Sequence, residues 1–155
     1  MKKILFTYFA FFLVVATVHA QELTWHTDME KALDIATKEN KKMMLFFTGS
    51  DWCGWCKKLQ KEVFMTSDFQ AWSDSVVLVE IDFPKRTPQD DKTRGQNQHL
   101  QSIFKVRGYP TVYFVSPEKT TDGRTNLKSL GRTGYVRGGA EKWLDVANNI
   151  VEKDI

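Results

Sequence analysis

Two short stretches of the chain are apolar at nearly every position, and they restrict its fold more than any other feature. Met43–Phe47 contains no polar residue, and Val76–Asp82 contains only Glu80 before its last position. Apolar runs of about four to eight residues indicate strands that are buried on both faces. A sheet built around such strands needs helices on each face, so we expect an α/β fold.

Amphipathic segments flank these strands in the order that such a fold requires. Apolar residues at helical spacing predict helices over residues 27–40, 57–64, 89–104 and 140–151. The first helix is predicted to open at Thr27, which has the spacing of a capping box with Glu30. A third strand is predicted at Thr111–Val115, and a turn signal predicts that Arg124–Leu130 pairs back as a hairpin. These elements predict a central mixed sheet with helices on both faces.

Residues 1–20 have the pattern of an export signal. Lys2 and Lys3 precede the apolar run Ile4–Val18, and a small-residue cleavage site ends at Ala20. The apolar run is shorter than the roughly 20 residues of a membrane span. We therefore expect a signal peptide, cleavage near Ala20, and a single domain over residues 21–155 that is periplasmic or secreted. The alternative is that the segment stays as an N-terminal anchor.

The charge balance of the expected mature domain argues against one class of partner. Removing Lys2 and Lys3 leaves 20 basic and 19 acidic side chains, a net charge of +1. Lys57, Lys58 and Lys61 are grouped, and we interpret them as a solvated helix face. Nucleic-acid binding usually needs a clustered basic patch, so we expect no nucleic-acid partner.

Cys53 and Cys56 are the two cysteines of the chain. Their Cys-x-x-Cys spacing permits either a redox disulfide or half of a metal site. Zinc would need two further ligands, and after signal cleavage only His26 and His99 remain, far away in sequence and without ligand spacing. A purely structural bridge would close so small a loop that it adds little stability. Redox chemistry is therefore favoured, and we expect no metal site.

The position of the two cysteines also predicts a different chemical role for each. Cys53 follows a strand and a short loop, which places it at the first turn of a helix. Unpaired N–H groups and the positive end of the helix dipole favour a thiolate there. We predict that Cys53 is the nucleophile and that Cys56, one turn further along and more buried, is the resolving thiol.

Two separate motifs, one around the cysteines and one about fifty residues later, resemble those of a known family. Trp52-Cys53-Gly54-Trp55-Cys56, together with Gly108-Tyr109-Pro110-Thr111 further along, resembles the thioredoxin superfamily over residues 25–153. Asp82-Phe83-Pro84 is similar to a motif of the exported thioredoxin-like proteins of bacterial envelopes. The resemblance implies a thioredoxin fold and a cis Tyr109–Pro110 bond. It also implies that Tyr109, Pro110 and Thr111 offer backbone groups to an extended substrate while Trp52 covers one side of Cys53.

Two positions depart from the best-known thioredoxins. Phe47 replaces their buried aspartate, so proton transfer to and from Cys56 needs another group or water. Glu80 is our candidate, and the alternative is that it is an acid at a solvated strand end. Trp55 replaces a proline, and we predict that it joins the substrate-binding surface. Unlike proline, Trp55 has a backbone N–H, and this should be one more donor near the Cys53 sulfur. Such a donor would favour the thiolate and make the disulfide more oxidising than in cytosolic thioredoxins.

The sequence thus predicts an exported thiol–disulfide oxidoreductase that exchanges disulfides with envelope proteins, as a reductase or isomerase. No cofactor is needed. The expected partners are protein disulfides and a membrane or soluble redox protein that supplies or accepts electrons, because an oxidising compartment would otherwise trap the pair as a disulfide. We expect a monomer. The alternative from another class is a non-catalytic thioredoxin-fold module that binds or assembles envelope proteins.

Overall fold

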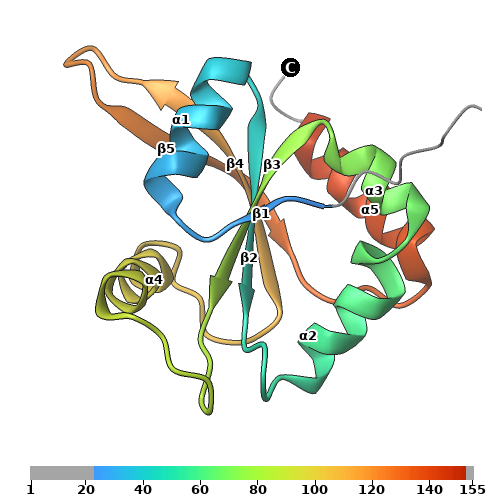
Figure 1. Cartoon of the computed structure of the whole chain (residues 1–155). Helices are drawn as coiled ribbons and strands as arrows, with labels where there is room; N and C mark the ends of the chain where they lie inside the picture. Colours follow the sequence, from blue (N-terminus) through green and yellow to red (C-terminus); the bar gives the residue numbers. More distant parts are fainter. Residues whose placement is uncertain (1–22, 153–155) are drawn as a thin grey trace, which may run out of the picture.

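The computed structural model describes residues 23–152, which form a five-stranded sheet in the order β1-β3-β2-β4-β5 (Figure 1). Strands β1, β3 and β2 are parallel, whereas β4 runs antiparallel to both β2 and β5. The expected mixed sheet is therefore confirmed. The strands are β1 Trp25–His26, β2 Lys42–Thr48, β3 Val76–Asp82, β4 Thr111–Lys119 and β5 Thr125–Thr133.

Helices cover both faces of this sheet, as the two apolar strands require. On one face lie α1 Met29–Glu39 and α4 Asp91–Ile103. The other face is covered by α2 Gly54–Leu59, the π-helical turn η1 Gln60–Phe64, α3 Ser67–Ser73 and α5 Gly139–Val151. The single helix predicted after the cysteines is thus α2 continued by η1, and its predicted apolar face is buried.

Strand β2 divides the core into two halves. Met44 and Phe46 pack with the cysteines and with α2, α3 and α5. Met43, Leu45 and Phe47 alternate with them and pack against α1 and α4. Because successive side chains of a strand point to opposite faces, an unbroken apolar run fills both cores. The expectation that Met43–Phe47 is a strand buried on both faces is confirmed.

Some predicted boundaries were wrong. The N-cap of α1 is Asp28 and not Thr27: its carboxylate accepts hydrogen bonds from the N–H groups of Glu30 and Lys31, at 3.1 and 3.2 Å. An aspartate caps as well as a threonine and adds negative charge at the positive end of the helix. Helix α4 begins at Asp91 rather than Gln89, and the hairpin strand extends to Thr133.

Two elements were absent from the prediction. Strand β1 has only two residues and pairs with Leu78 and Val79, which is too short to produce a pattern in sequence. Helix α3 is capped by Thr66, whose hydroxyl accepts from the Phe69 N–H at 3.3 Å. The predicted signal peptide lies outside the described residues. Within 23–152, no helix has the length and apolar character needed to cross a membrane.

The topology brings two loops together. Strands β2 and β3 are parallel and end at the same edge, with Thr48 opposite Asp82. The cysteine loop, residues 49–53, leaves β2 at that edge, and the facing loop, residues 83–87, leaves β3 beside it. In parallel α/β sheets, functional groups collect at this end of the strands.

Candidate active site

Cys53 and Cys56 form a disulfide at the start of α2, with Cα atoms 5.3 Å apart. Cys53 is the N-cap residue of the helix, and its sulfur accepts a hydrogen bond from the Cys56 N–H at 3.2 Å. That N–H has no partner within the helix, so the sulfur satisfies a donor that would otherwise be free. Cys53 retains 5% exposure and Cys56 1%. A negative charge on Cys53 after reduction would meet the same donor.

Trp55 lies on the surface beside the disulfide, with 56% of its area exposed. Its ring is 5.1 Å from that of Tyr135, and the Lys58 ammonium lies 5.2 Å from each ring. In this disulfide form the hydrogen bond to the Cys53 sulfur comes from the Cys56 N–H. That the Trp55 backbone N–H is a further donor to the thiolate, and that the disulfide is more oxidising than in cytosolic thioredoxins, stay predictions.

The Tyr109–Pro110 peptide bond is cis, as the resemblance implied. The Tyr109 ring makes an edge contact with Trp52, with centroids 5.7 Å apart, and its hydroxyl accepts a hydrogen bond from the Gln101 side chain at 2.6 Å. The structure thus brings together two predicted residues that are distant in sequence. Thr111 begins β4, and its hydroxyl donates to the Gly108 carbonyl at 2.8 Å.

Trp52 is held between the two loops. Its indole N–H donates to the Phe83 carbonyl at 2.8 Å, and the Lys85 ammonium lies 4.0 Å from the ring centroid. Gly49 leaves the space that the indole occupies, since a Cβ at this position would be 2.6 Å from Nε1 and 2.7 Å from Cζ2 of Trp52. A glycine is required there for close approach, not for an unusual backbone angle.

Two aspartates link the cysteine loop to the end of β3 and the facing loop. Asp82 accepts hydrogen bonds from the cysteine loop, and Asp51 accepts them from the facing loop. Asp82, at the end of β3, accepts from the N–H of Ser50 at 2.8 Å and from its hydroxyl at 2.5 Å. Asp51, in the cysteine loop, accepts from the N–H groups of Lys85, Arg86 and Thr87 at 2.6 to 3.2 Å. These backbone hydrogen bonds, led by that of Lys85, lower the pKa of Asp51 from 3.8 to about 2. The carboxylate is therefore charged at neutral pH.

Phe47 is at the position where the best-known thioredoxins have a buried aspartate, and it is part of the apolar core. Phe47 is fully buried in the core half that faces α1 and α4, with its ring 5.9 Å from that of Phe104. Glu80 lies opposite Phe46 in the parallel pairing, so it points to the other face, which is the face of the cysteines. It is half-buried, and burial together with the neighbouring Asp82 raises its pKa. Glu80 makes no hydrogen bond to either cysteine.

Glu80 lines a cavity of about 250 Å³ with six other residues. Most of the lining is apolar: Leu23, Trp25, Phe46, Phe64 and Met65, with Gln60 as the other polar residue. The acid is thus in mid-strand, in contact with a cavity, and not at a solvated strand end. A carboxyl group in such surroundings favours its neutral form.

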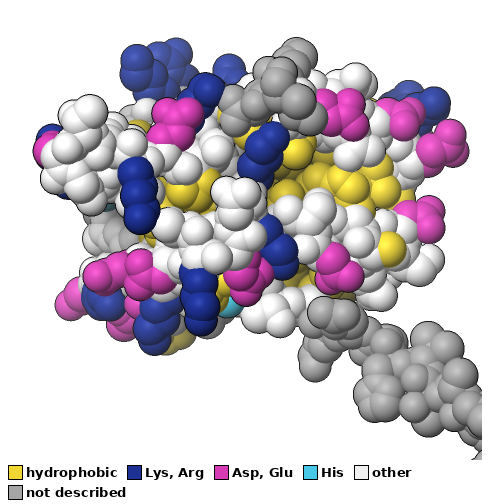
Figure 2. All heavy atoms as spheres, turned by 90° about the horizontal axis from the view of Figure 1, so that it is seen from above, with side chains coloured by type: hydrophobic (Ala, Val, Ile, Leu, Met, Phe, Trp, Pro, Cys, Tyr) yellow, Lys and Arg dark blue, Asp and Glu magenta, His cyan; other side chains and the backbone are white. Residues whose placement is uncertain are grey.

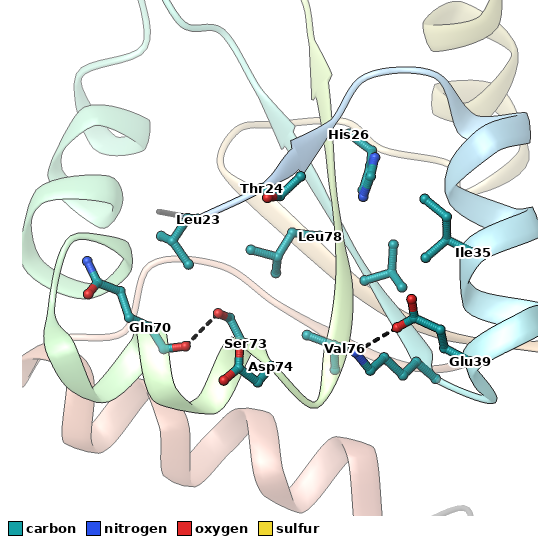
Figure 3. Close-up of a pocket in the computed structure, with 12 residues that line it drawn as sticks. Leu23, Thr24, His26, Ile35, Glu39, Gln70, Ser73, Asp74, Val76 and Leu78 are labelled. Carbon is teal, nitrogen blue, oxygen red and sulfur yellow. Dashed lines mark hydrogen bonds and ion pairs between the residues drawn. The ribbon is translucent and has the colours of Figure 1, made fainter. Parts of the chain in front are cut away.

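A different cavity, of about 240 Å³, opens at the edge of the sheet near the beginning of β3 (Figure 3). His26, Glu39 and Asp74 line it, from β1, α1 and the end of α3, and no cysteine does. We place the thiol–disulfide chemistry at Cys53 and Cys56, because this cavity is lined by no thiol and they lie outside it. Among residues 23–152, no group of three or more His, Cys, Asp or Glu side chains is placed to hold a metal ion.

Sequence reasoning did not find several residues of this site. Asp51 and Lys85 act through contacts between two loops more than 30 positions apart, and no local pattern indicates such a pairing. Tyr135 contacts Trp55 and donates to Glu62 at 2.5 Å, again from a distant segment. The Asp82-Phe83-Pro84 motif was the one available signal, since it marked the facing loop.

Comparisons with known proteins agree with this geometry. Residues 29–137 match the family described as the thioredoxin-like domain. The chain is 34% identical over 128 residues to the disulfide bond reductase DsbH of Chlamydia pneumoniae, across 82% of this chain and 72% of that protein. A solved structure of a DsbH oxidoreductase has a TM-score of 0.72 at 31% identity and covers 84% of this chain and 85% of its own.

A second relative is much longer than the region it shares with this chain. It is the thioredoxin-related protein DsbJ of Chlamydia pneumoniae, 33% identical over 101 residues. That match covers 64% of this chain and 29% of DsbJ, so the chain spans less than a third of that protein. The family match and the disulfide pair lead to one conclusion: the chain belongs to the thioredoxin-like family and is a thiol–disulfide oxidoreductase.

Proposed function

We propose that this protein is an exported oxidoreductase that reduces or isomerises disulfides in envelope proteins. The observation that carries the proposal is the Cys53 sulfur, which caps α2 and accepts the Cys56 N–H, directly after Trp52, whose ring contacts that of Tyr109. A nucleophilic thiolate needs a donor and a binding surface close to it, and both are supplied. That one relative is named a disulfide bond reductase supports the reductive direction.

The reaction has two exchange steps. The reduced Cys53 thiolate attacks one sulfur of a substrate disulfide, so that a mixed disulfide forms and the other substrate sulfur leaves as a thiolate. The Cys56 thiolate then attacks the Cys53 sulfur, which releases the second substrate thiolate and forms the Cys53–Cys56 disulfide. Two electrons pass to the substrate. A membrane or soluble redox protein must return the pair to the dithiol before the next cycle.

Other residues have supporting roles in this proposal. Tyr109, Pro110 and Thr111 offer backbone groups to an extended substrate chain, and Trp52 and Trp55 provide aromatic surface on either side of Cys53. Glu80 exchanges a proton with Cys56, directly or through water in the cavity that it lines. The pKa of Glu80 is raised by burial and by Asp82, which is the direction that a proton donor requires.

We infer that residues 1–20 direct export and are removed near Ala20, so that residues 21–155 work as a monomer in the periplasm or outside the cell. The basic, apolar and small-residue order of the N-terminus supports this inference. Mass spectrometry of protein purified from the envelope of an expressing bacterium tests the cleavage, and a mature form that begins at Met1 would contradict it. Size-exclusion chromatography with light scattering tests the monomer.

The decisive experiment compares Cys56→Ala with Cys53→Ala in a turnover assay and in a trapping assay. Cys56→Ala should lose turnover of a protein disulfide with a dithiol donor and should accumulate mixed disulfides through Cys53. Cys53→Ala should lose turnover and trap little, because Cys56 is the less exposed of the two cysteines and lies further along the helix. If Cys56→Ala turns over substrate as well as the parent, the exchange mechanism is refuted and a binding or assembly module becomes the better description.

A further inference from the structure

The acidic side chains next to the disulfide are engaged by the protein itself. Asp51 accepts backbone N–H groups of the facing loop, and Asp82 accepts both donors of Ser50. Glu62 accepts the Tyr135 hydroxyl and lies 3.7 Å from Lys58. The negative charges at this end of the molecule are therefore directed at partners within the protein and not at an incoming chain.

The basic side chains at the same place are exposed. Lys57, Lys85 and Arg86 are all solvent-exposed, and among residues 23–152 no acid lies within ion-pair distance of any of them, although the Arg86 charge contributes to the lowered pKa of Asp51. Each residue contacts Asp51: the Lys57 ammonium donates to its carbonyl at 3.3 Å, and the backbone N–H groups of Lys85 and Arg86 donate to its carboxylate. We call Lys57, Lys85 and Arg86 the basic rim.

Lys85 is the rim residue whose backbone and side chain both have defined contacts in the cysteine loop. Its backbone is fixed by Asp51, and its ammonium lies over the ring of Trp52, the residue that precedes Cys53. A cation held over an aromatic ring loses less side-chain freedom when it pairs with an acid than one that is free in solvent. Lys85 is thus pre-organised to meet a negative charge near the substrate cysteine.

The opposite end of the sheet has a different charge arrangement. Figure 2 views that end and shows basic and acidic side chains interspersed around a band of hydrophobic ones. Several of the basic residues away from the disulfide are paired, including Lys41 with Glu39 at 2.8 Å and Lys128 with Glu118 at 3.3 Å. At the rim, the three positive charges of Lys57, Lys85 and Arg86 outnumber the two carboxylates of Asp51 and Asp82, which leaves a small local excess of positive charge.

We propose that the basic rim selects polypeptide substrates that have acidic side chains next to the cysteine attacked by Cys53, and that Lys85 is the main specificity-determining residue. This inference rests on the proposed function, since it describes the substrates of the same disulfide. Charges at the rim of an interface act mainly on association rate and partner choice. The rim thus determines which disulfides react fastest and leaves the exchange chemistry unchanged.

The test uses the reduced full chain and two synthetic peptide disulfides that differ only in the residues flanking the reacting cysteine, glutamates in one and lysines in the other. The rate of peptide reduction is followed by stopped-flow tryptophan fluorescence. Lys85→Glu reverses the charge, and Lys85→Met removes it but keeps the stem over Trp52. Lys38→Glu, in the last turn of α1 at the other end of the sheet, is the matched control.

For the parent we expect the acidic peptide to react roughly two- to fivefold faster than the basic one, the range of one or two exposed ion pairs. Lys85→Met should reduce this ratio, Lys85→Glu should abolish or invert it, and Lys38→Glu should leave it unchanged. The preference should fade at about 1 M salt, where the screening length is only about 3 Å. Equal rates for the two peptides, or the same preference in parent and Lys85→Glu, would overturn the proposal. If the parent reduces neither peptide, the proposed function itself fails.

Discussion

Replacing Gly49 with alanine tests whether Trp52 is positioned as the structure indicates. The added Cβ would be 2.6 Å from the indole nitrogen, a distance that real Cβ contacts do not reach. The indole is not the flexible end of a long side chain, because its N–H is bound to the Phe83 carbonyl. The ring must therefore rotate or shift, and the hydrogen bond must break or weaken.

The expected cost follows from these two effects. Overpacking of this kind costs about 1–3 kcal/mol, and the lost hydrogen bond about 0.5–1.5 kcal/mol. Gly49→Ala should thus lower the free energy of unfolding by roughly 2–4 kcal/mol. With about 2–4 °C per kcal/mol for a domain of this size, Tm should fall by roughly 4–16 °C. Peptide-disulfide reduction should also slow, because Trp52 leaves its place beside Cys53.

Thermal unfolding of the oxidised protein, followed by circular dichroism and tryptophan fluorescence, measures the change. Gly95→Ala is the matched control, since nothing lies within 4 Å of a Cβ there and the residue is inside α4. It should raise the free energy of unfolding by about 0.5–1 kcal/mol, as glycine is a weak helix former. If Gly49→Ala unfolds within about 0.5 kcal/mol of the parent and its fluorescence is unchanged, the packing of Trp52 described above is wrong.

Two further predictions concern polar groups in the core. The Thr48 hydroxyl is buried and has no hydrogen-bond partner among the described residues, so the isosteric Thr48→Val should stabilise the oxidised protein by about 1 kcal/mol or more in denaturant unfolding; an equal or lower stability would contradict this. Burial and Asp82 raise the folded-state pKa of Glu80 above its unfolded value of 4.5, so the native state binds more protons and the free energy of unfolding should fall as pH rises from about 4.5 through the raised pKa. Glu80→Gln should remove that part of the pH dependence, and a profile identical to the parent's would show that Glu80 does not titrate as described.

Local and periodic features were predictable from sequence because their causes are local. Strands β2 and β3 are found where they were expected, since a strand that is buried on both faces needs apolar residues at nearly every position. Cys53 could be placed at a helix start because a strand, a loop and a helical pattern occur in succession. The cis bond before Pro110 followed from a motif and not from physics.

Features that depend on contacts between distant segments were not predictable. The two residues of β1 become a strand only because β3 supplies their partners. The hydrogen bond from the Cys56 N–H to the Cys53 sulfur was not predicted, because it depends on the geometry of the first helical turn. Asp51 could not be distinguished from any other loop acid until the facing loop was in place.

The disulfide is a local contact in the sequence, whereas the contacts around it are non-local, and this difference has a consequence for folding. The disulfide joins residues three positions apart, but the contacts of Trp52 and Asp51 with the facing loop join residues 31 to 36 positions apart. Non-local contacts form late in folding because the intervening chain must first be ordered. An unfolded chain can therefore close the disulfide, yet in it neither Trp52 nor the basic rim is held in place by the facing loop. The reactivity of Cys53 should accordingly report whether β2 and β3 have paired, so that thiol chemistry at this site serves as a probe of the assembled sheet.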